Sequence, residues 1–302
     1  MKIFVIVIGI LAVISLIGWL WMERSLFPKK STLDVYKESD ISLFNKAVAY
    51  FYGVRPDLYL KPASWLWLAR WTEKSNAGET YHGKVITKTD AAKIIKLDKP
   101  VNLPDLEHVV PYRVAKSIIL REPLPSISVI ECPCRAQKED ACLPRDVCLV
   151  VGEPFATFVV EHQKTARKLT VEEALAIIDA EEERGHIHTA WFKESNHDRF
   201  YAICNCCSCC CLGMKSYLRG VPRIVHSGYK PIVDSELCTG CGACTDYCYF
   251  KAIGEVTESP ELDMELCMGC GICVSHCPNE AISLVLAPEK GIPLDIDVLV
   301  GN

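Results

Sequence analysis

The sequence predicts an α+β protein in three parts: an N-terminal apolar helix, a cysteine-rich middle domain of mixed α/β structure and a small C-terminal module. Three observations support this class: an uncharged apolar run at the N-terminus, helix and strand patterns in the middle, and two related cysteine runs near the end. A chain of 302 residues is long enough for several domains. We expect boundaries that give segments 1–30, 31–80, 81–229 and 230–302.

The N-terminal segment is predicted to be a membrane anchor. Residues 3–22 carry no charge, and roughly 20 apolar residues cross a bilayer as a helix. A cleaved signal peptide is the alternative, but no small-residue cleavage site follows the run. Arg24, Lys29 and Lys30 after the run outnumber Lys2 before it, which predicts a cytoplasmic soluble part. The expectation is a transmembrane helix, a single-pass inner-membrane location and the membrane as a partner.

The segment 31–80 has a helical pattern at residues 41–52 and then an aromatic stretch with Trp65, Trp67 and Trp71. Such a stretch can lie in a lipid interface. We favour an ordinary core helix, because apolar helical faces are usually buried against protein.

The first half of the middle domain alternates helix and strand signals. We predict a short helix at 90–95, a longer one within 103–122 and a β-branched strand at 127–130. These elements lead into the first upstream cysteines.

The second half of the middle domain begins with a helix-start signal. Thr170 and Glu173 form a capping-box pattern, and Gly185 is placed to end the helix after about residue 183. Strand-like runs at 186–192 and 199–203 follow, so the sequence predicts a helix and then a hairpin.

Two cysteine runs in the C-terminal module carry the strongest chemical signal. Their spacing is C-x2-C-x2-C-x3-C in both, which is typical of proteins with two [4Fe–4S] clusters. Three close thiolates cap one cluster, and the fourth cysteine points to the other cluster. The predicted ligands are therefore Cys238, Cys241, Cys244 and Cys277 for one cluster, and Cys267, Cys270, Cys273 and Cys248 for the second.

The same cysteine runs have two alternative interpretations. Zinc sites usually pair C-x2-C units across a longer gap, and a disulfide knot needs an oxidising compartment. Both explain the spacing less well than two clusters. Residues 230–286 resemble the bacterial-type two-cluster ferredoxins, which implies electron transfer; one departure is Tyr249, where the second run has Pro278.

Ten further cysteines lie upstream in two groups, and we interpret them as metal ligands. If the second group stays extended, alternation places Cys204, Cys206 and Cys210 on one face. Ten thiols allow one cubane with six left over, or two with two left over. We expect at least one more [4Fe–4S] cluster drawing on both groups, with zinc as the main alternative and a redox-active dithiol as a third. The ten are Cys132, Cys134, Cys142 and Cys148, then Cys204, Cys206, Cys207, Cys209, Cys210 and Cys211.

We do not expect the charged and titratable residues near these cysteine groups to be metal ligands. Arg135 could offset thiolate charge, or form a surface salt bridge. We expect His186, His188 and His197 to be structural or solvent-facing, because cysteines are abundant.

A wider resemblance covers residues 80–290. It is similar to a family of iron–sulfur proteins of anaerobic bacteria that have a ferredoxin-type dicluster domain, and it implies electron transfer without an assigned substrate. The motifs that carry it are YHGKVITKTDAAKII, DLEHVVPYRVAKSIIL, ECPCR, CLVVGEPFA and FYAICNCCSCCC.

Composition narrows the function class. A net charge of −5 without a long basic run argues against a nucleic-acid partner. No phosphate loop, dinucleotide fingerprint or serine elbow is present, and electron transfer needs no catalytic residue. We expect a membrane-anchored electron carrier that relays electrons through two clusters and a further metal centre to a redox partner protein. The alternatives are an iron–sulfur reductase that uses an unusual cluster or dithiol at residues 204–211, and a zinc-stabilised scaffold that carries the ferredoxin module.

Overall fold

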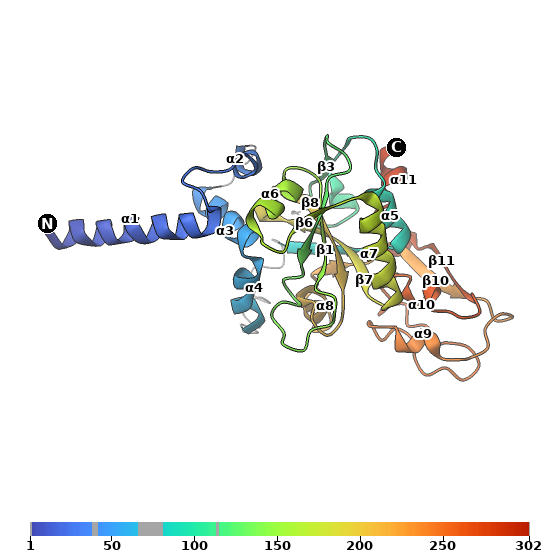
Figure 1. Cartoon of the computed structure of the whole chain (residues 1–302). Coiled ribbons are helices and arrows are strands. Elements are labelled where there is room, and N and C mark those ends of the chain that lie inside the picture. The colour runs from blue at the N-terminus through green and yellow to red at the C-terminus, as the bar shows by residue number, and fades with distance from the viewer. Residues whose placement is uncertain (1, 38–41, 66–80, 113–114, 302) are drawn as a thin grey trace.

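The centre of the molecule is a nine-stranded mixed sheet (Figure 1). The computed structural model describes residues 2–37, 42–65, 81–112 and 115–301. Seven strands follow the order β6-β4-β5-β8-β7-β1-β9, and β2 joins through β3 to β8. The strands are β1 (Tyr81–Val85), β2 (Val101–Pro104), β3 (Ser117–Leu120), β4 (Ile127–Glu131), β5 (Asp146–Val151), β6 (Arg167–Leu169), β7 (Ile187–Lys193), β8 (Arg199–Cys206) and β9 (Ile224–Val225).

Helices lie before the sheet in the chain and on both of its faces. The first four are α1 (Lys2–Glu23), α2 (Lys30–Lys37), α3 (Leu43–Val54) and α4 (Pro56–Trp65). Those between and after the strands are α5 (Lys88–Ile95), α6 (Phe155–His162), α7 (Val171–Glu183) and α8 (Leu212–Tyr217), with short 3-10 turns at Leu106–His108 and Glu194–Asn196.

The two faces of the sheet form two separate cores, because side chains alternate along each strand. On β5, Leu149 and Val151 pack with α5 and α7, whereas Cys148 and Val150 face α3 and α6. Figure 1 shows α5 and α7 together on one side of the sheet and α3 and α6 on the other. Six of the ten upstream cysteines belong to the core on the α3/α6 face, so this face positions much of the candidate site.

The C-terminal module packs beside the sheet (Figure 1). Its antiparallel ribbon pairs β10 (Tyr229–Val233) with β11 (Ile282–Leu286). Two one-turn helices, α9 (Ala243–Asp246) and α10 (Ile272–Ser275), follow the cysteine loops, and the chain ends in a 3-10 turn at Pro288–Lys290 and in α11 (Ile296–Gly301).

The structure contradicts the prediction of a transmembrane anchor at residues 1–30 and of a single-pass inner-membrane location. Within the ranges that the structure describes, no helix combines the length and apolarity needed to cross a membrane. The C-terminal end of α1 packs on the protein instead: Trp19 stacks on Tyr50, and the buried Glu23 accepts a 2.5 Å hydrogen bond from the Tyr50 hydroxyl. Hydropathy alone does not distinguish these contacts from contacts with lipid.

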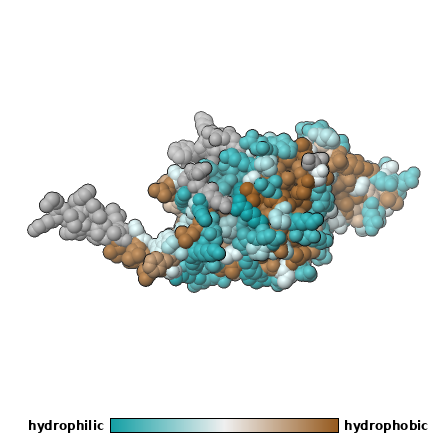
Figure 2. Space-filling view, turned by 90° about the horizontal axis from the view of Figure 1, so that it is seen from above, coloured by the Kyte–Doolittle hydropathy of each residue, from teal (hydrophilic) through white to brown (hydrophobic). Residues whose placement is uncertain are grey.

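The described part of α1 is apolar on its surface. Figure 2 shows it as the hydrophobic extension at the left of the molecule, next to the grey residues. The exposed side chains are Val13, Ile14, Leu16, Ile17, Leu20 and Trp21.

Most elements predicted for the middle domain are present. The capping box of Thr170 and Glu173 forms and opens α7, and the predicted hairpin is the β7–β8 pair. The prediction of a helix within residues 103–122 is wrong, because the described part of that segment forms β2, a 3-10 turn and β3. Pro111 interrupts that segment and cannot donate a helical hydrogen bond. The aromatic stretch with Trp67 and Trp71 lies outside the described residues.

Candidate metal centres

Two cavities in the C-terminal module are each lined by four cysteines. The outer cavity is lined by Cys238, Cys241, Cys244 and Cys277, and also by Val256 and Pro260. The inner cavity is lined by Cys248, Cys267, Cys270 and Cys273, with Phe250, Met268 and Ile272 beside them. In each cavity three thiols come from one cysteine run, and the fourth comes from the other run.

The two halves of the module are related by a repeat that crosses over. The amide of Asp234 donates to the carbonyl of Ala281 at 2.8 Å, and the amide of Asp263 donates to that of Ala252 at 2.7 Å. Each bond joins the start of one half to the end of the other. The exchange of the fourth cysteine therefore follows from the backbone pairing.

Backbone amides also point at the cysteine sulfurs. The amide of Ala252 lies 3.3 Å from Cys248 Sγ, and the amide of Ala281 lies 3.2 Å from Cys277 Sγ. Such contacts stabilise a thiolate that carries negative charge and help set the potential of a bound cluster. The donor set and its amide contacts thus fit a [4Fe–4S] cluster in each cavity.

Burial favours the protonated form of two thiols of the inner cavity, Cys270 and Cys273. It raises the pKa of Cys273 to about 12 and raises the pKa of Cys270 well above its ordinary value, with a smaller contribution from neighbouring thiolates. Iron binding must therefore displace protons, since only thiolates ligate metal.

Comparison with known families agrees with this geometry. Residues 231–254 and 260–283 match the family model of the 4Fe-4S binding domain. The C-terminal module is a ferredoxin-type module that binds [4Fe–4S] clusters. No curated protein matches the chain.

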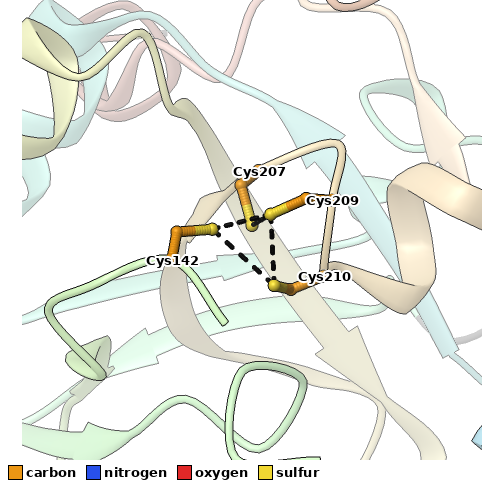
Figure 3. Close-up of side chains that lie close together, drawn as sticks. All are labelled: Cys142, Cys207, Cys209 and Cys210. Carbon is orange, nitrogen blue, oxygen red and sulfur yellow. Dashed lines mark hydrogen bonds between the residues drawn. The ribbon is translucent and has the colours of Figure 1, made fainter. Parts of the chain in front are cut away.

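The ten upstream cysteines divide into groups of four and six. The four-thiol group consists of Cys142, Cys207, Cys209 and Cys210, whose sulfurs all lie within 4.8 Å of one another. Figure 3 shows Cys142 on the loop before β5, pointing at the three others on the loop after β8. The sulfur of Cys209 lies 2.7 Å from that of Cys142, 3.2 Å from Cys210 and 3.5 Å from Cys207.

These distances suit one metal ion. Four thiolates around a tetrahedral ion at a metal–sulfur distance of about 2.3 Å stand about 3.8 Å apart. In a cubane each thiolate caps a different iron, so the four sulfurs must stand farther apart. The four-thiol group is therefore compact enough for a single zinc or iron ion.

The six-thiol group consists of Cys132, Cys134, Cys148, Cys204, Cys206 and Cys211. Its members are neighbours in series: Cys204 lies near Cys148, Cys148 near Cys132, Cys132 near Cys134, and Cys134 near Cys211. Cys211 and Cys206 complete it, with their sulfurs 3.3 Å apart. Strand alternation correctly predicted that Cys204 and Cys206 share a face, but β8 ends at Cys206, so Cys210 lies in the four-thiol group.

A large cavity adjoins the six-thiol group on the α3/α6 face. Its volume is about 100 Å³, compared with about 20 Å³ in each of the inner and outer cavities. All six thiols line it, and much of the remaining wall is apolar. Tyr52 and Tyr201, whose hydroxyl oxygens are 2.9 Å apart, also line it, as does Tyr81.

A buried ion pair lies next to the two thiol groups. Arg135 is fully buried, not on the surface, and its Nη2 donates to Glu181 at 2.6 Å and to the carbonyl of Asn205 at 3.1 Å. Burial alone would lower the pKa of Arg135, but Glu181 raises it, and the Cys132 and Cys207 thiolates add to this. The guanidinium thus supplies positive charge to both thiol groups.

The three histidines of the hairpin pair with other polar groups, and only His186 contacts the Arg135–Glu181 pair. His186 Nδ1 lies 2.7 Å from Glu181, and His188 Nε2 lies 2.9 Å from Glu182. His197 contacts the carbonyl of Val35 at 2.6 Å. Glu181 and Glu182 were not predicted from the sequence, although two carboxylates at the end of a capped helix, just before His186 and His188, are a recognisable pattern.

The inner cavity and the upstream thiols share one core. Met268, Ile272 and Phe250 pack in the same buried cluster as Cys132, Cys148, Cys206 and Cys211. Tyr249, which replaces the proline of the other run, is half-buried, and its pKa is raised first by that burial and then by Cys207, Cys142 and Cys209. Tyr249 directly follows the cluster ligand Cys248 in the chain, and its side chain lies near the four-thiol group.

Replacement of Gly269 by alanine tests the cradle of the inner cavity. Gly269 has φ +63°, and a Cβ there would lie 1.9 Å from the carbonyl oxygen of Tyr229, which is a backbone atom that cannot move aside. We expect Gly269→Ala to lose the inner cluster, seen as a loss of about four irons per chain by iron analysis. Gly254→Ala is the control, since nothing lies within 4 Å of its Cβ position; equal iron loss in both variants would contradict the account.

The buried ion pair predicts a large effect on stability. Glu181→Gln leaves the Arg135 charge buried without its carboxylate partner, and we expect a cost of about 3–5 kcal/mol in the free energy of unfolding. The matched control on the same helix is Asp179→Asn, which breaks an exposed pair with Lys88 and should cost at most about 1 kcal/mol. Chemical unfolding of the metal-loaded variants measures both, and similar costs would show that burial of the Arg135 pair has no special weight.

Proposed function

We propose that the protein transfers electrons through two [4Fe–4S] clusters in the C-terminal module. The single observation that carries this proposal is the pair of cavities, each lined by three cysteines of one run and the fourth of the other. The assigned ligands are Cys238, Cys241, Cys244 and Cys277 for the outer cluster, and Cys248, Cys267, Cys270 and Cys273 for the inner one. When bound, a cluster accepts and releases one electron, and the thiolates and amides set its potential.

The positions of the two cavities suggest a direction for the relay. The outer cavity includes the exposed Cys241, and Cys244 and Ile282 on its wall belong to a small core apart from that of the middle domain. The inner cavity shares its core with the upstream cysteines. We infer that the outer cluster exchanges electrons with a redox partner protein and that the inner cluster exchanges them with the middle domain.

The four-thiol group supports a further metal centre in the middle domain. Its sulfur spacing suits one tetrahedral ion. Zinc at this position would stabilise the loops before β5 and after β8, whereas iron would add a redox centre near Tyr249.

Paired substitutions test the crossed ligand assignment. Cys277→Ser should remove the same cluster as Cys241→Ser, because both thiols line the outer cavity, and each should lower iron by about four per chain. Cys248→Ser and Cys270→Ser should match each other in the same way. Electron paramagnetic resonance of the reduced, anaerobically purified proteins identifies the remaining cluster. A Cys277→Ser spectrum that matches Cys270→Ser would show that each run binds its own cluster.

A second candidate function, an iron–sulfur reductase, is favoured by the large cavity. Its volume exceeds that of either cluster cavity, and the Tyr52–Tyr201 hydroxyl pair lies on its wall. Reduction of a small uncharged disulfide would consume two electrons from the clusters and two protons, and release two thiols. The six-thiol group would be the site of reduction.

Turnover with oxidised lipoamide as the probe tests the reductase. With chemically reduced protein, we expect thiol release, and Ala49→Phe should abolish it by filling the cavity that Ala49 lines. Leu43→Phe, at an exposed position of the same helix, is the control. If the wild-type protein releases no thiols, or if Ala49→Phe is as active as Leu43→Phe, reduction in this cavity is excluded for the probe.

A further inference from the structure

The six-thiol group has more ligands than any single tetrahedral ion can use. It draws two thiols from the loop after β4, one from β5 and three from β8 and the turn that follows. None of these six belongs to the compact four-thiol group. A single ion takes four thiolates, so two would remain buried without a role if the group held only one ion.

The burial of this group also requires an explanation. Cys132, Cys148, Cys206 and Cys211 are each at most 7% exposed, and all six are free of disulfides. Burial of thiols from three segments in mutual contact is unusual packing, because aliphatic side chains would fill the same space with better-defined rotamers. A shared metal cofactor accounts for their convergence.

The ferredoxin module supplies an internal reference for such a site. In both of its cavities, cysteines from separate segments surround the space that we assign to a cluster. The large cavity follows the same plan: all thiols of the six-thiol group lie along its wall, and Cys207 of the four-thiol group borders it as well. The fully buried guanidinium of Arg135 also lines this cavity, where its positive charge offsets negative charge on the thiolates.

We propose that the six-thiol group binds a polynuclear iron–sulfur cluster, as a centre distinct from both ferredoxin clusters and from the single-ion site at the four-thiol group. The chain then has four metal centres. The proposal relies on the proposed function for its electron supply, through the core that joins the inner cavity to Cys132, Cys148, Cys206 and Cys211.

Iron, acid-labile sulfide and zinc analysis of the full-length protein, purified without oxygen, tests this inference. Two cubanes account for about eight sulfide ions per chain, and we expect wild type to exceed that number. Cys132→Ser and Cys204→Ser should each lose the excess iron and sulfide together. Cys209→Ser is the matched control: it should lose one metal ion and no sulfide, because it belongs to the four-thiol group.

Several results would overturn the proposal. Wild type with only about eight sulfides would do so even if the variants fail to fold, at four per cubane. So would Cys132→Ser and Cys204→Ser proteins that keep all their iron and sulfide, or that lose zinc in their place. Electron paramagnetic resonance of the same samples reports the two ferredoxin clusters separately. Failure of the six-thiol centre is therefore distinguishable from failure of the electron-transfer function.

Discussion

A metal cluster needs several thiolates around one space, and in this structure the cysteines around each cavity come from more than one segment of the chain. The rest of the structure depends on this constraint. In the C-terminal module, crossed backbone pairing of Asp234 with Ala281 and of Asp263 with Ala252 brings the fourth cysteine of each run to the other run. In the middle domain, antiparallel pairing of β5 with β8 brings Cys148 beside Cys204. The sheet and the ribbon are therefore the frames that gather the thiols.

Thiols that lie close together also concentrate negative charge when they ionise to bind metal. A buried positive charge lies beside the upstream thiols of this structure. Arg135 carries positive charge to the thiol groups and is itself held by Glu181 and the carbonyl of Asn205. Burial alone would raise the pKa of Glu181, but hydrogen bonds from His186 and Arg135 lower it overall. The helix α7 and the hairpin thus hold Arg135 beside the upstream thiols, although neither carries a whole thiol group.

The local features of this fold were predictable from sequence because they depend on residues close together in the chain. The capping box at Thr170 needs only Glu173, and the ligand spacing of each C-terminal run reports a tight loop. The division of ten cysteines into four and six was not predictable. It depends on where β8 ends, since the turn after Cys206 sends Cys210 to one group and Cys211 to the other. The helix predicted within residues 103–122 was wrong for a similar reason, because the pairing of β2 with β3 overrides the helical pattern.

The most direct test of the crossed ligand sets is a crystal of the anaerobically purified protein with diffraction recorded on both sides of the iron absorption edge. The account predicts an iron cluster between Cys244 and Cys277 and a second between Cys248 and Cys273, with each cluster touching both cysteine runs. Anomalous iron density that contacts the four cysteines of one run alone, or an absence of iron from these two cavities, would contradict it.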